Sequence, residues 1–148
     1  RFFTVYGPWG RPDMAAFIFV KRILAGDPIP VFNNGEMRRD FTYIDDIVAG
    51  VVGCLDNPAH MTDGSIAHRV YNIGNNQSES LMDFVAVIED ALGRKAEIDF
   101  QPMQPGDVAE TFADIDDTKR DFGFDPRTSM TEGVPRFIEW YREYYGVK

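Results

Sequence analysis

Short strand-type runs alternate with helix-type runs along the chain, and glycine, proline or a capping residue marks most of the changes. The apolar spacing predicts helices over residues 14–24, 47–55, 80–92, 115–122 and 130–145. Strands are predicted over residues 2–5, 29–32, 39–44, 69–73 and 96–100. This mixture indicates an α/β fold, α+β-like in isolation, and the order of the elements leaves the sheet topology open.

Polar residues before three of the helical runs predict where those helices begin. Asp13 is expected to cap the first helix, and Asp45 or Asp46 the second. The last helix has a capping-box pattern, in which Ser129 is followed three residues later by Glu132. Pro135 removes one backbone hydrogen bond in the second turn, which predicts either a kinked start or a later one.

Composition limits the classes of partner. The net charge of −9 and the pI of about 4.6 argue against diffuse nucleic-acid binding, although a few arginines could still bind an anion locally. We expect neither a membrane segment nor a secretory leader, because no apolar run approaches the roughly 20 residues of a membrane helix. The single cysteine, Cys54, excludes an internal disulfide and a Cys-rich metal site. A buried thiol and a cytoplasmic location are therefore expected.

Anion binding is the chemistry that the residues support best. Arg11 lies in a Gly/Pro loop just before a predicted helix, and Arg38 and Arg39 follow the Asn34-Gly35 turn. A guanidinium fork matches carboxylate or phosphate, and a helix N-terminus adds unpaired N–H groups. The competing interpretation is that these arginines only balance an acidic surface.

Three further residues could contact a nucleotide. Phe32 beside Val31 could stack on a base, but an aromatic residue in a strand is more often part of the core. Asp107, after Pro105-Gly106, could accept hydrogen bonds from ribose hydroxyls or simply form a turn.

Nucleophilic and metal catalysis have weaker support. His60 and His68 fall in a polar loop and point to no obvious nucleophile. The adjacent pairs Asp45-Asp46 and Asp116-Asp117 stand at predicted helix starts, where capping and the helix dipole explain them without a metal.

Four blocks of the sequence, in the correct order, resemble UDP-glucuronate 4-epimerases of the extended short-chain dehydrogenase/reductase family. Residues 1–15 resemble the segment after the catalytic Tyr-x-x-x-Lys helix, and residues 39–46 the Arg-Asp-Tyr/Phe block. Residues 71–75 resemble a later strand, and residues 102–108 the loop over the nucleotide. Ala113-Asp114 and the closing aromatic helix fit as well, so the resemblance covers essentially the whole chain.

The resemblance implies that residues 1–148 form the C-terminal substrate-binding portion of such an enzyme, and that the N-terminal dinucleotide-binding (Rossmann) domain is absent. The chain lacks a Gly-x-x-Gly-x-x-Gly loop, and its one Tyr-x-x-x-Lys match, Tyr144 with Lys148, ends the last helix. The opening inside a strand without Met also suggests a piece of a longer chain. No catalytic residue is expected here, and the chain alone should be inactive.

The reaction and partners are implied in the same way. NAD would take a hydride from C4 of the sugar and return it to the other face, interconverting UDP-glucuronate and UDP-galacturonate. The expected partners are the UDP-sugar, the missing N-terminal domain and a second subunit in a homodimeric parent enzyme. The alternatives are another UDP-sugar epimerase or decarboxylase of the family, a non-catalytic nucleotide-sugar binding module, and an interaction protein without a ligand.

The resemblance also assigns residues. Phe2 and Phe3 would lie beside the nicotinamide and sugar, and Thr4 with Arg11 would hold the uronate carboxylate. Val31 and Phe32 would line the uracil, Arg39 would meet the pyrophosphate and Asp107 the ribose. Gln104 stands near a position where many relatives have a phosphate-binding arginine, which weakens the expected pyrophosphate contacts.

The missing domain would leave apolar surface uncovered. The faces formed by Ile47, Val51 and Leu55, and by Val70 and Ile73, are expected to be exposed. Exposed patches of this kind favour association, so the isolated chain is predicted to be marginally stable or oligomeric.

Overall fold

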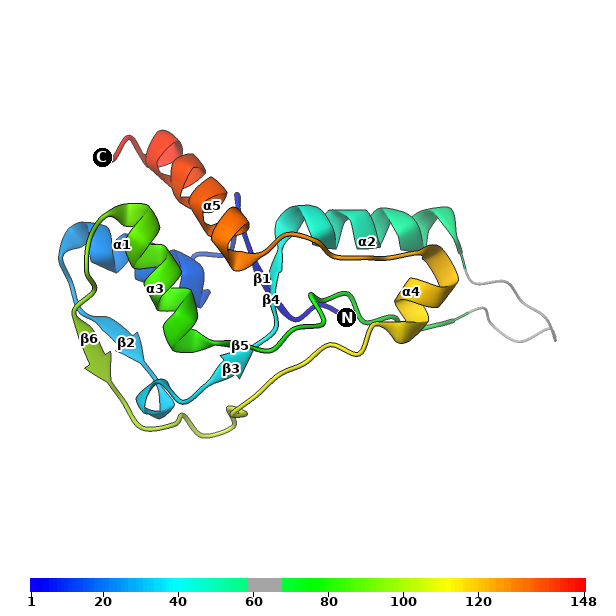
Figure 1. The fold of residues 1–148 in the computed structure, drawn as a ribbon, viewed down its shortest axis with the longest axis horizontal. Coiled ribbons are helices and arrows are strands. Elements are labelled where there is room, and N and C mark those ends of the chain that lie inside the picture. The colour runs from blue at the N-terminus through cyan, green and yellow to red at the C-terminus, as the bar shows by residue number, and fades with distance from the viewer. Residues whose placement is uncertain (59–67) are drawn as a thin grey trace.

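The computed structural model describes residues 1–58 and 68–148 (Figure 1). Its helices are α1 (Ala15–Ala25), α2 (Ile44–Asp56), α3 (Leu81–Leu92), α4 (Asp116–Phe122) and α5 (Met130–Tyr145), with one 3-10 turn, η1 (Asn33–Gly35). Its strands are β1 (Thr4–Tyr6), β2 (Ile29–Val31), β3 (Arg38–Arg39), β4 (Phe41–Tyr43), β5 (Glu79–Ser80) and β6 (Ile98–Phe100). None of the helices in these two ranges is long and apolar enough to cross a membrane.

The strands pair in three two-stranded sheets. β1 runs parallel to β4, with Thr4 opposite Phe41. β2 runs parallel to β6, with Ile29 opposite Ile98, and β3 runs antiparallel to β5. The mixed α/β architecture predicted from the sequence is therefore confirmed, and the pairing adds the topology that the order of elements left open.

The main core lies where α1, α3 and α5 meet the strands β1, β2 and β4 (Figure 1). Phe84 of α3 is fully buried and stacks on Phe41 of β4, with ring centroids 4.0 Å apart and an interplanar angle of 9°. Tyr6 of β1 meets the Phe84 ring edge-on at 5.6 Å, and burial raises the pKa of its hydroxyl. A smaller cluster lies between α2 and α4 and contains Ile47, Ile73, Ala113, Ile115 and Phe124.

Several predicted helix boundaries are confirmed. The Ser80 hydroxyl caps α3 by accepting the backbone N–H groups of Met82 and Asp83 at 3.2 and 3.4 Å. The capping box of Ser129 and Glu132 is present at the start of α5, which begins at Met130 and contains Pro135. α1 and α3 end on left-handed glycines, Gly26 and Gly93, close to the predicted helix ends at residues 24 and 92.

The predicted aspartate caps are wrong. Met14 occupies the N-cap of α1 without a side-chain hydrogen bond, because the Asp13 carboxylate pairs with Arg11 instead. Tyr43 occupies the N-cap of α2, and Asp45 and Asp46 lie in its first turn. Asp46 accepts the backbone N–H groups of 127 and 128, so it joins α2 to the segment that leads into α5.

Two predicted strands are also wrong in extent. The run 39–44 is interrupted at Asp40, whose N–H donates to the Thr111 hydroxyl at 3.2 Å, and its last residue already belongs to α2. The run 69–73 keeps only an isolated parallel bridge between Ile73 and Phe2. Its other backbone groups find separate partners: the Arg1 amino group donates to the Tyr71 carbonyl at 2.7 Å, and the Thr118 hydroxyl donates to the Asn72 carbonyl at 2.6 Å.

The prediction of exposed apolar faces is correct for part of the set. On α2, Leu55 is 76% exposed and Val51 is also exposed, and Val70 is exposed in the following segment. Ile47 and Ile73 are buried, because the smaller core cluster of this chain covers them. Cys54 packs against the same cluster as a half-buried thiol, and burial raises its pKa.

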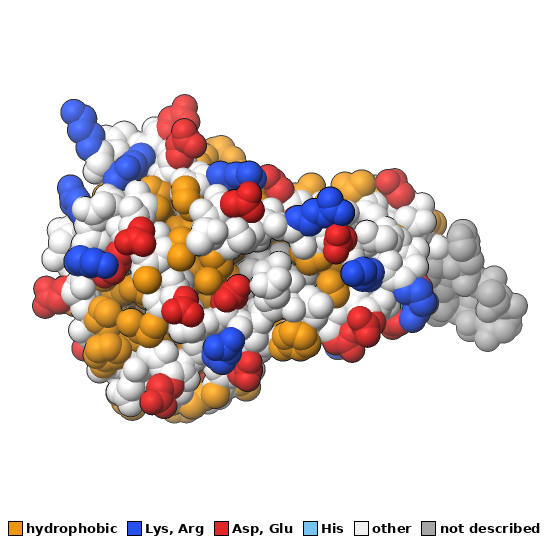
Figure 2. All heavy atoms as spheres, in the orientation of Figure 1, with side chains coloured by type: hydrophobic (Ala, Val, Ile, Leu, Met, Phe, Trp, Pro, Cys, Tyr) orange, Lys and Arg blue, Asp and Glu red, His pale blue; other side chains and the backbone are white. Residues whose placement is uncertain are grey.

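Acidic and basic side chains are interspersed over the face drawn in Figure 2, with apolar side chains between them. The net charge of −9 is therefore not gathered into one field on this face. His68 is exposed, and His60 lies outside the described residues.

Candidate functional site

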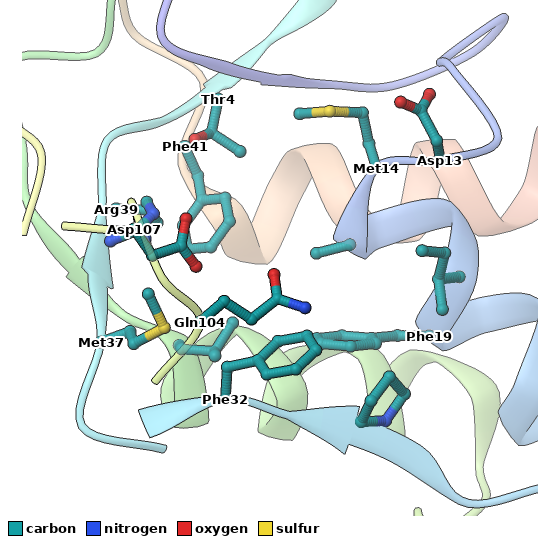
Figure 3. A pocket seen from close by; sticks show the side chains of 14 residues that line it. Thr4, Asp13, Met14, Phe19, Phe32, Met37, Arg39, Phe41, Gln104 and Asp107 are labelled. Atoms are coloured by element: carbon teal, nitrogen blue, oxygen red, sulfur yellow. The ribbon is translucent and has the colours of Figure 1, made fainter. Parts of the chain in front are cut away.

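A pocket of about 310 Å³ lies beside the main core, a size at the lower end of small-molecule sites. It collects residues from separate parts of the chain (Figure 3). Its polar side chains are Thr4, Asp13, Arg39, Gln104 and Asp107. Its apolar lining includes Met14, Ile18, Phe19, Phe32, Met37, Phe41 and Leu81. An apolar floor with a few polar groups around it suits a ligand that has both a flat ring and anionic groups.

Two neighbouring strands set the inner end of the pocket. Thr4 on β1 lies opposite Phe41 on β4, and the Thr4 N–H donates to the Asp40 carbonyl at 3.1 Å. Arg39, the last residue of β3, stands two residues before Phe41 in the chain. The parallel pairing therefore brings the start of the chain next to residues that stand more than thirty positions later.

Arg39 is the cation of the pocket. Its Nη1 donates to the carbonyl oxygens of Arg38 and Ala109 at 2.9 and 3.2 Å, and among the described residues it forms no ion pair. Arg38 differs, since its Nε lies 3.3 Å from a Glu110 carboxylate oxygen. Arg39 is thus fixed by carbonyls while its charge stays available for an anion.

The loop that carries Gln104 and Asp107 is tied to the strand below it. The Gln101 N–H donates to the Val31 carbonyl at 2.9 Å, and the Asp107 N–H closes a turn on the Gln104 carbonyl at 3.1 Å. In Figure 3 the Asp107 carboxylate lies on the same side of the pocket as Arg39, and the Gln104 amide lies above the Phe32 ring.

Arg11 does not line the pocket. Its guanidinium engages Asp13 through two contacts, Nε to Oδ1 at 3.1 Å and a second from Nη2 to Oδ2. The side chains of Arg11 and Asp13 are 74% and 61% exposed. Hydrogen bonding to the guanidinium lowers the pKa of Asp13, and the same bond raises that of Arg11. Arg11 thus stands beside a lining residue, at the edge of the pocket, and is not itself part of the lining.

Two further placements bear on the sequence-based assignments. The Val31 side chain is fully buried in the main core, so it does not line the pocket as expected; alternation along β2 leaves the pocket to Pro30 and Phe32. Phe2 is exposed ahead of β1, and Phe3 packs against the smaller core cluster. Neither phenylalanine lines the pocket.

The loop before α1 is anchored by an aromatic contact. Trp9 has a left-handed φ of 63° and is 73% exposed, yet its ring lies 5.4 Å from Trp140 and 5.0 Å from Tyr144, both on α5. A bulky residue at positive φ is uncommon, which indicates that the contact fixes the turn. Arg11 and Asp13 follow this turn in the chain, so its position affects theirs.

Replacing Trp9→Ala should destabilise the protein by about 1–2 kcal/mol, because two aromatic contacts of roughly 0.5–1.5 kcal/mol each are lost. Thermal or urea unfolding followed by circular dichroism measures the change. Trp9→Phe keeps a ring at the same place and should retain most of the stability. An alanine variant as stable as the wild type would show that the Trp9 ring does not anchor this loop.

Comparison with known proteins places this arrangement in a family. The model of the NAD dependent epimerase/dehydratase family matches residues 1–74, which is half of the chain. The chain belongs to that family. The resemblance of the sequence blocks is thereby confirmed at the level of the family.

Individual relatives of the epimerase/dehydratase chain agree with its family. Protein CapI of Staphylococcus aureus is 49% identical over 98% of this chain and 47% of its own length. The probable UDP-glucuronate 4-epimerase of Rhizobium meliloti (strain 1021) is 48% identical over 98% of this chain and 46% of its own length. This chain therefore spans just under half the length of these relatives.

A solved structure matches the fold of the epimerase/dehydratase chain. The UDP-glucuronic acid 4-epimerase from Bacillus cereus, in complex with UDP-glucuronic acid and NAD, superposes with a TM-score of 0.86 at 34% identity. The match covers 98% of this chain and 45% of the Bacillus cereus chain.

Sequence reasoning missed most of the apolar lining of the site. Met37, Phe41, Phe19 and Leu81 are buried and form part of the main core as well as the pocket floor. Their apolar pattern is that of any core residue, so no local signal distinguishes these pocket residues from the rest of the core. Asp13 has the sequence pattern of a helix cap, and the Gly/Pro-rich loop around it is the signal that it lies at a site.

Proposed function

We propose that this chain supplies the substrate site of an NAD-dependent nucleotide-sugar 4-epimerase that interconverts UDP-glucuronate and UDP-galacturonate. The observation that carries the proposal is the pocket, which brings together Thr4, Phe32, Arg39, Gln104 and Asp107 from separate segments. Each is a residue that the resemblance to this family assigns to the UDP-sugar. Membership of the epimerase/dehydratase family and the fold match to an enzyme solved with UDP-glucuronic acid and NAD support the same reaction.

The chemistry of the lining fits a uridine diphosphate. The Phe32 ring offers a flat apolar face for the base, and the Asp107 carboxylate accepts hydrogen bonds from ribose hydroxyls. Arg39 offers guanidinium N–H groups to the diphosphate while carbonyls hold it in place. Gln104 can add a neutral donor where a second cation would bind more strongly.

Thr4 and Arg11 are the proposed pair for the uronate carboxylate. Thr4 reaches the pocket from β1, and Arg11 stands at the rim on the loop that Trp9 anchors. A carboxylate with two oxygens suits the guanidinium fork, whereas a neutral hydroxymethyl group does not. Selection of a uronate over a neutral sugar therefore rests on Arg11.

NAD supplies hydride acceptance and donation when it is bound. The fit of this chain to the cofactor is confined to one face, where Phe2 is exposed directly ahead of the strand that carries Thr4. We propose that an N-terminal dinucleotide-binding domain holds most of the cofactor and the catalytic residues. The relatives are about twice as long as this chain, which leaves room for such a domain. On this proposal residues 1–148 are the C-terminal substrate-binding portion and are inactive alone.

Two further features belong to the proposal. A homodimer follows from the resemblance to the family, with the apolar face of α2 reserved for the rest of the subunit. A cytoplasmic location is favoured by the single cysteine, which is a half-buried free thiol.

The Arg11→Ala variant tests the substrate. In the full-length protein with NAD, isothermal titration should show about 10- to 100-fold weaker binding of UDP-glucuronate, because a charge-assisted contact is lost. Binding of UDP-glucose should change little. Arg22→Ala removes the same charge from the surface of α1, where its guanidinium donates to the Pro28 carbonyl, and serves as the control. Equal losses for both sugars would remove the uronate from the proposal.

The product separates the proposed reaction from its relatives. UDP-galacturonate should form from UDP-glucuronate without release of carbon dioxide. Carbon dioxide release would assign a decarboxylase, and binding without turnover would assign a nucleotide-sugar binding module.

A further inference from the structure

The carboxylate that holds Arg11 belongs to the pocket. Asp13 is one of the lining residues, and it occupies the guanidinium through Nε and Nη2. In Figure 3 the Asp13 carboxylate stands at the rim beside Met14, across the mouth from Arg39 and Asp107. The protein therefore carries an internal carboxylate on the arginine that a ligand carboxylate would need.

We propose that Asp13 is a specificity-determining residue, a resident carboxylate that holds Arg11 at the rim until the carboxylate of an acidic sugar replaces it. The inference rests on the proposed function and deepens it, since it concerns how the site recognises a uronate. It assigns to Asp13 a role that helix capping does not provide, because α1 has no side-chain cap.

The charges of the lining explain why the exchange matters. Arg39 is the one cation among the lining residues, with the Asp107 carboxylate as an anion of the same pocket, and the charge of Asp13 is already balanced by Arg11. A ligand with a diphosphate and a carboxylate needs a second cation. Moving Arg11 from Asp13 to the ligand supplies that cation, and it exchanges one guanidinium–carboxylate contact for another of the same chemistry.

The exchange distinguishes the two classes of sugar. A neutral hexose has no carboxylate that could compete with Asp13, so it leaves the Arg11–Asp13 pair intact. Both partners are mostly exposed, and water can solvate the released Asp13 carboxylate, so the pair restrains Arg11 only weakly. Asp13 thus lowers the affinity for a uronate by a small factor and leaves the affinity for a neutral sugar unchanged.

Asp13→Asn tests the inference in the full-length protein with NAD. UDP-glucuronate should bind about two- to fivefold more tightly, because an exposed ion pair of modest strength no longer competes. UDP-glucose affinity should stay within error. Asp27→Asn removes the same charge just beyond the other end of α1 and should change neither affinity.

A double variant decides the mechanism. In the Arg11→Ala background, Asp13→Asn should give no gain in UDP-glucuronate affinity, since Asp13 acts through Arg11. A gain that survives there, an equal gain for both sugars, or an unchanged or weaker uronate affinity in the single variant would each overturn the inference. The proposed function fails separately, if the wild type does not prefer UDP-glucuronate or if Arg11→Ala leaves its affinity intact.

Discussion

Replacing Phe84→Ala should lower the free energy of unfolding by about 3–5 kcal/mol, the usual cost of removing a buried phenylalanine ring. Phe84 is fully buried on α3, stacks on Phe41 and meets Tyr6 edge-on. Its loss opens a cavity between a helix and the parallel strands β1 and β4, which the surrounding core can fill only in part. Thermal unfolding followed by circular dichroism should show a fall in melting temperature of roughly 10 °C.

The same substitution should reach the pocket. Phe41 lines the site on its other side, so removing the ring behind it leaves the floor less well supported. Phe112→Ala is the matched control, because Phe112 is exposed and its loss should change stability by no more than about 0.5 kcal/mol. Equal effects of the two substitutions would contradict the central place of Phe84 in this core.

The site was predictable where a residue carries its chemistry in its type. Arg39, Asp107 and Phe32 offer charge, acceptor oxygens and a flat ring, and each lies in the pocket. Their meeting depends on the parallel pairing of β1 with β4 and on the loop after β6, which local periodicity does not contain. The resemblance supplied that long-range information in advance.

Other features depend on competition that a linear pattern does not show. Asp13 and Asp46 look like helix caps, but one finds a guanidinium and the other finds backbone N–H groups more than eighty positions away. Val31 and Phe32 are both apolar, and the pleat of β2 sends the first into the core and leaves the second in the pocket.

Helix boundaries were accurate where the signal is purely local. The predicted run 80–92 matches α3 to within one residue, since the hydroxyl cap of Ser80 and the left-handed Gly93 that delimit it need no distant partner. The strand predicted over 69–73 failed for the opposite reason, because its length depends on a neighbouring strand, and here its backbone bonds to Arg1 and to the Thr118 side chain instead.

Asp40 is the residue whose loss should affect the widest part of the structure. It is fully buried between β3 and β4, and its carboxylate accepts four hydrogen bonds. The donors are the Thr42 hydroxyl at 2.9 Å and the backbone N–H groups of Asn75, Asn76 and Ala113 at 2.7, 3.0 and 3.0 Å. The Asp40 side chain therefore joins β4 to two other segments. β4 carries the pocket residue Phe41, and the segment at Ala113 follows the loop that carries Gln104 and Asp107.

Asp40→Ala should lower the free energy of unfolding by about 3–5 kcal/mol, because three backbone N–H groups, two of them buried, and a buried hydroxyl lose their acceptor. Asp40→Asn should cost less than Asp40→Ala, because one acceptor oxygen remains. It should still lower the stability, because the new amide N–H₂ group faces N–H donors. Asp99→Asn is the control for the change in charge, because Asp99 is exposed and, within the described ranges, accepts a hydrogen bond from the Gln101 side chain alone. Urea unfolding of the three variants measures their free energies of unfolding and so the order of their stabilities.

A double-mutant cycle with Thr42→Val tests whether the network acts as a unit. Alone, Thr42→Val should cost about 1 kcal/mol, the usual net contribution of one hydrogen bond. In the Asp40→Ala background the same change should cost much less, because the buried Thr42 hydroxyl has already lost its hydrogen-bond acceptor. Additive losses would mean that Asp40 and Thr42 stabilise the fold independently. In that case the Asp40 carboxylate would stabilise the fold only through the backbone N–H groups of Asn75, Asn76 and Ala113, and the Thr42 hydroxyl would lie outside the network.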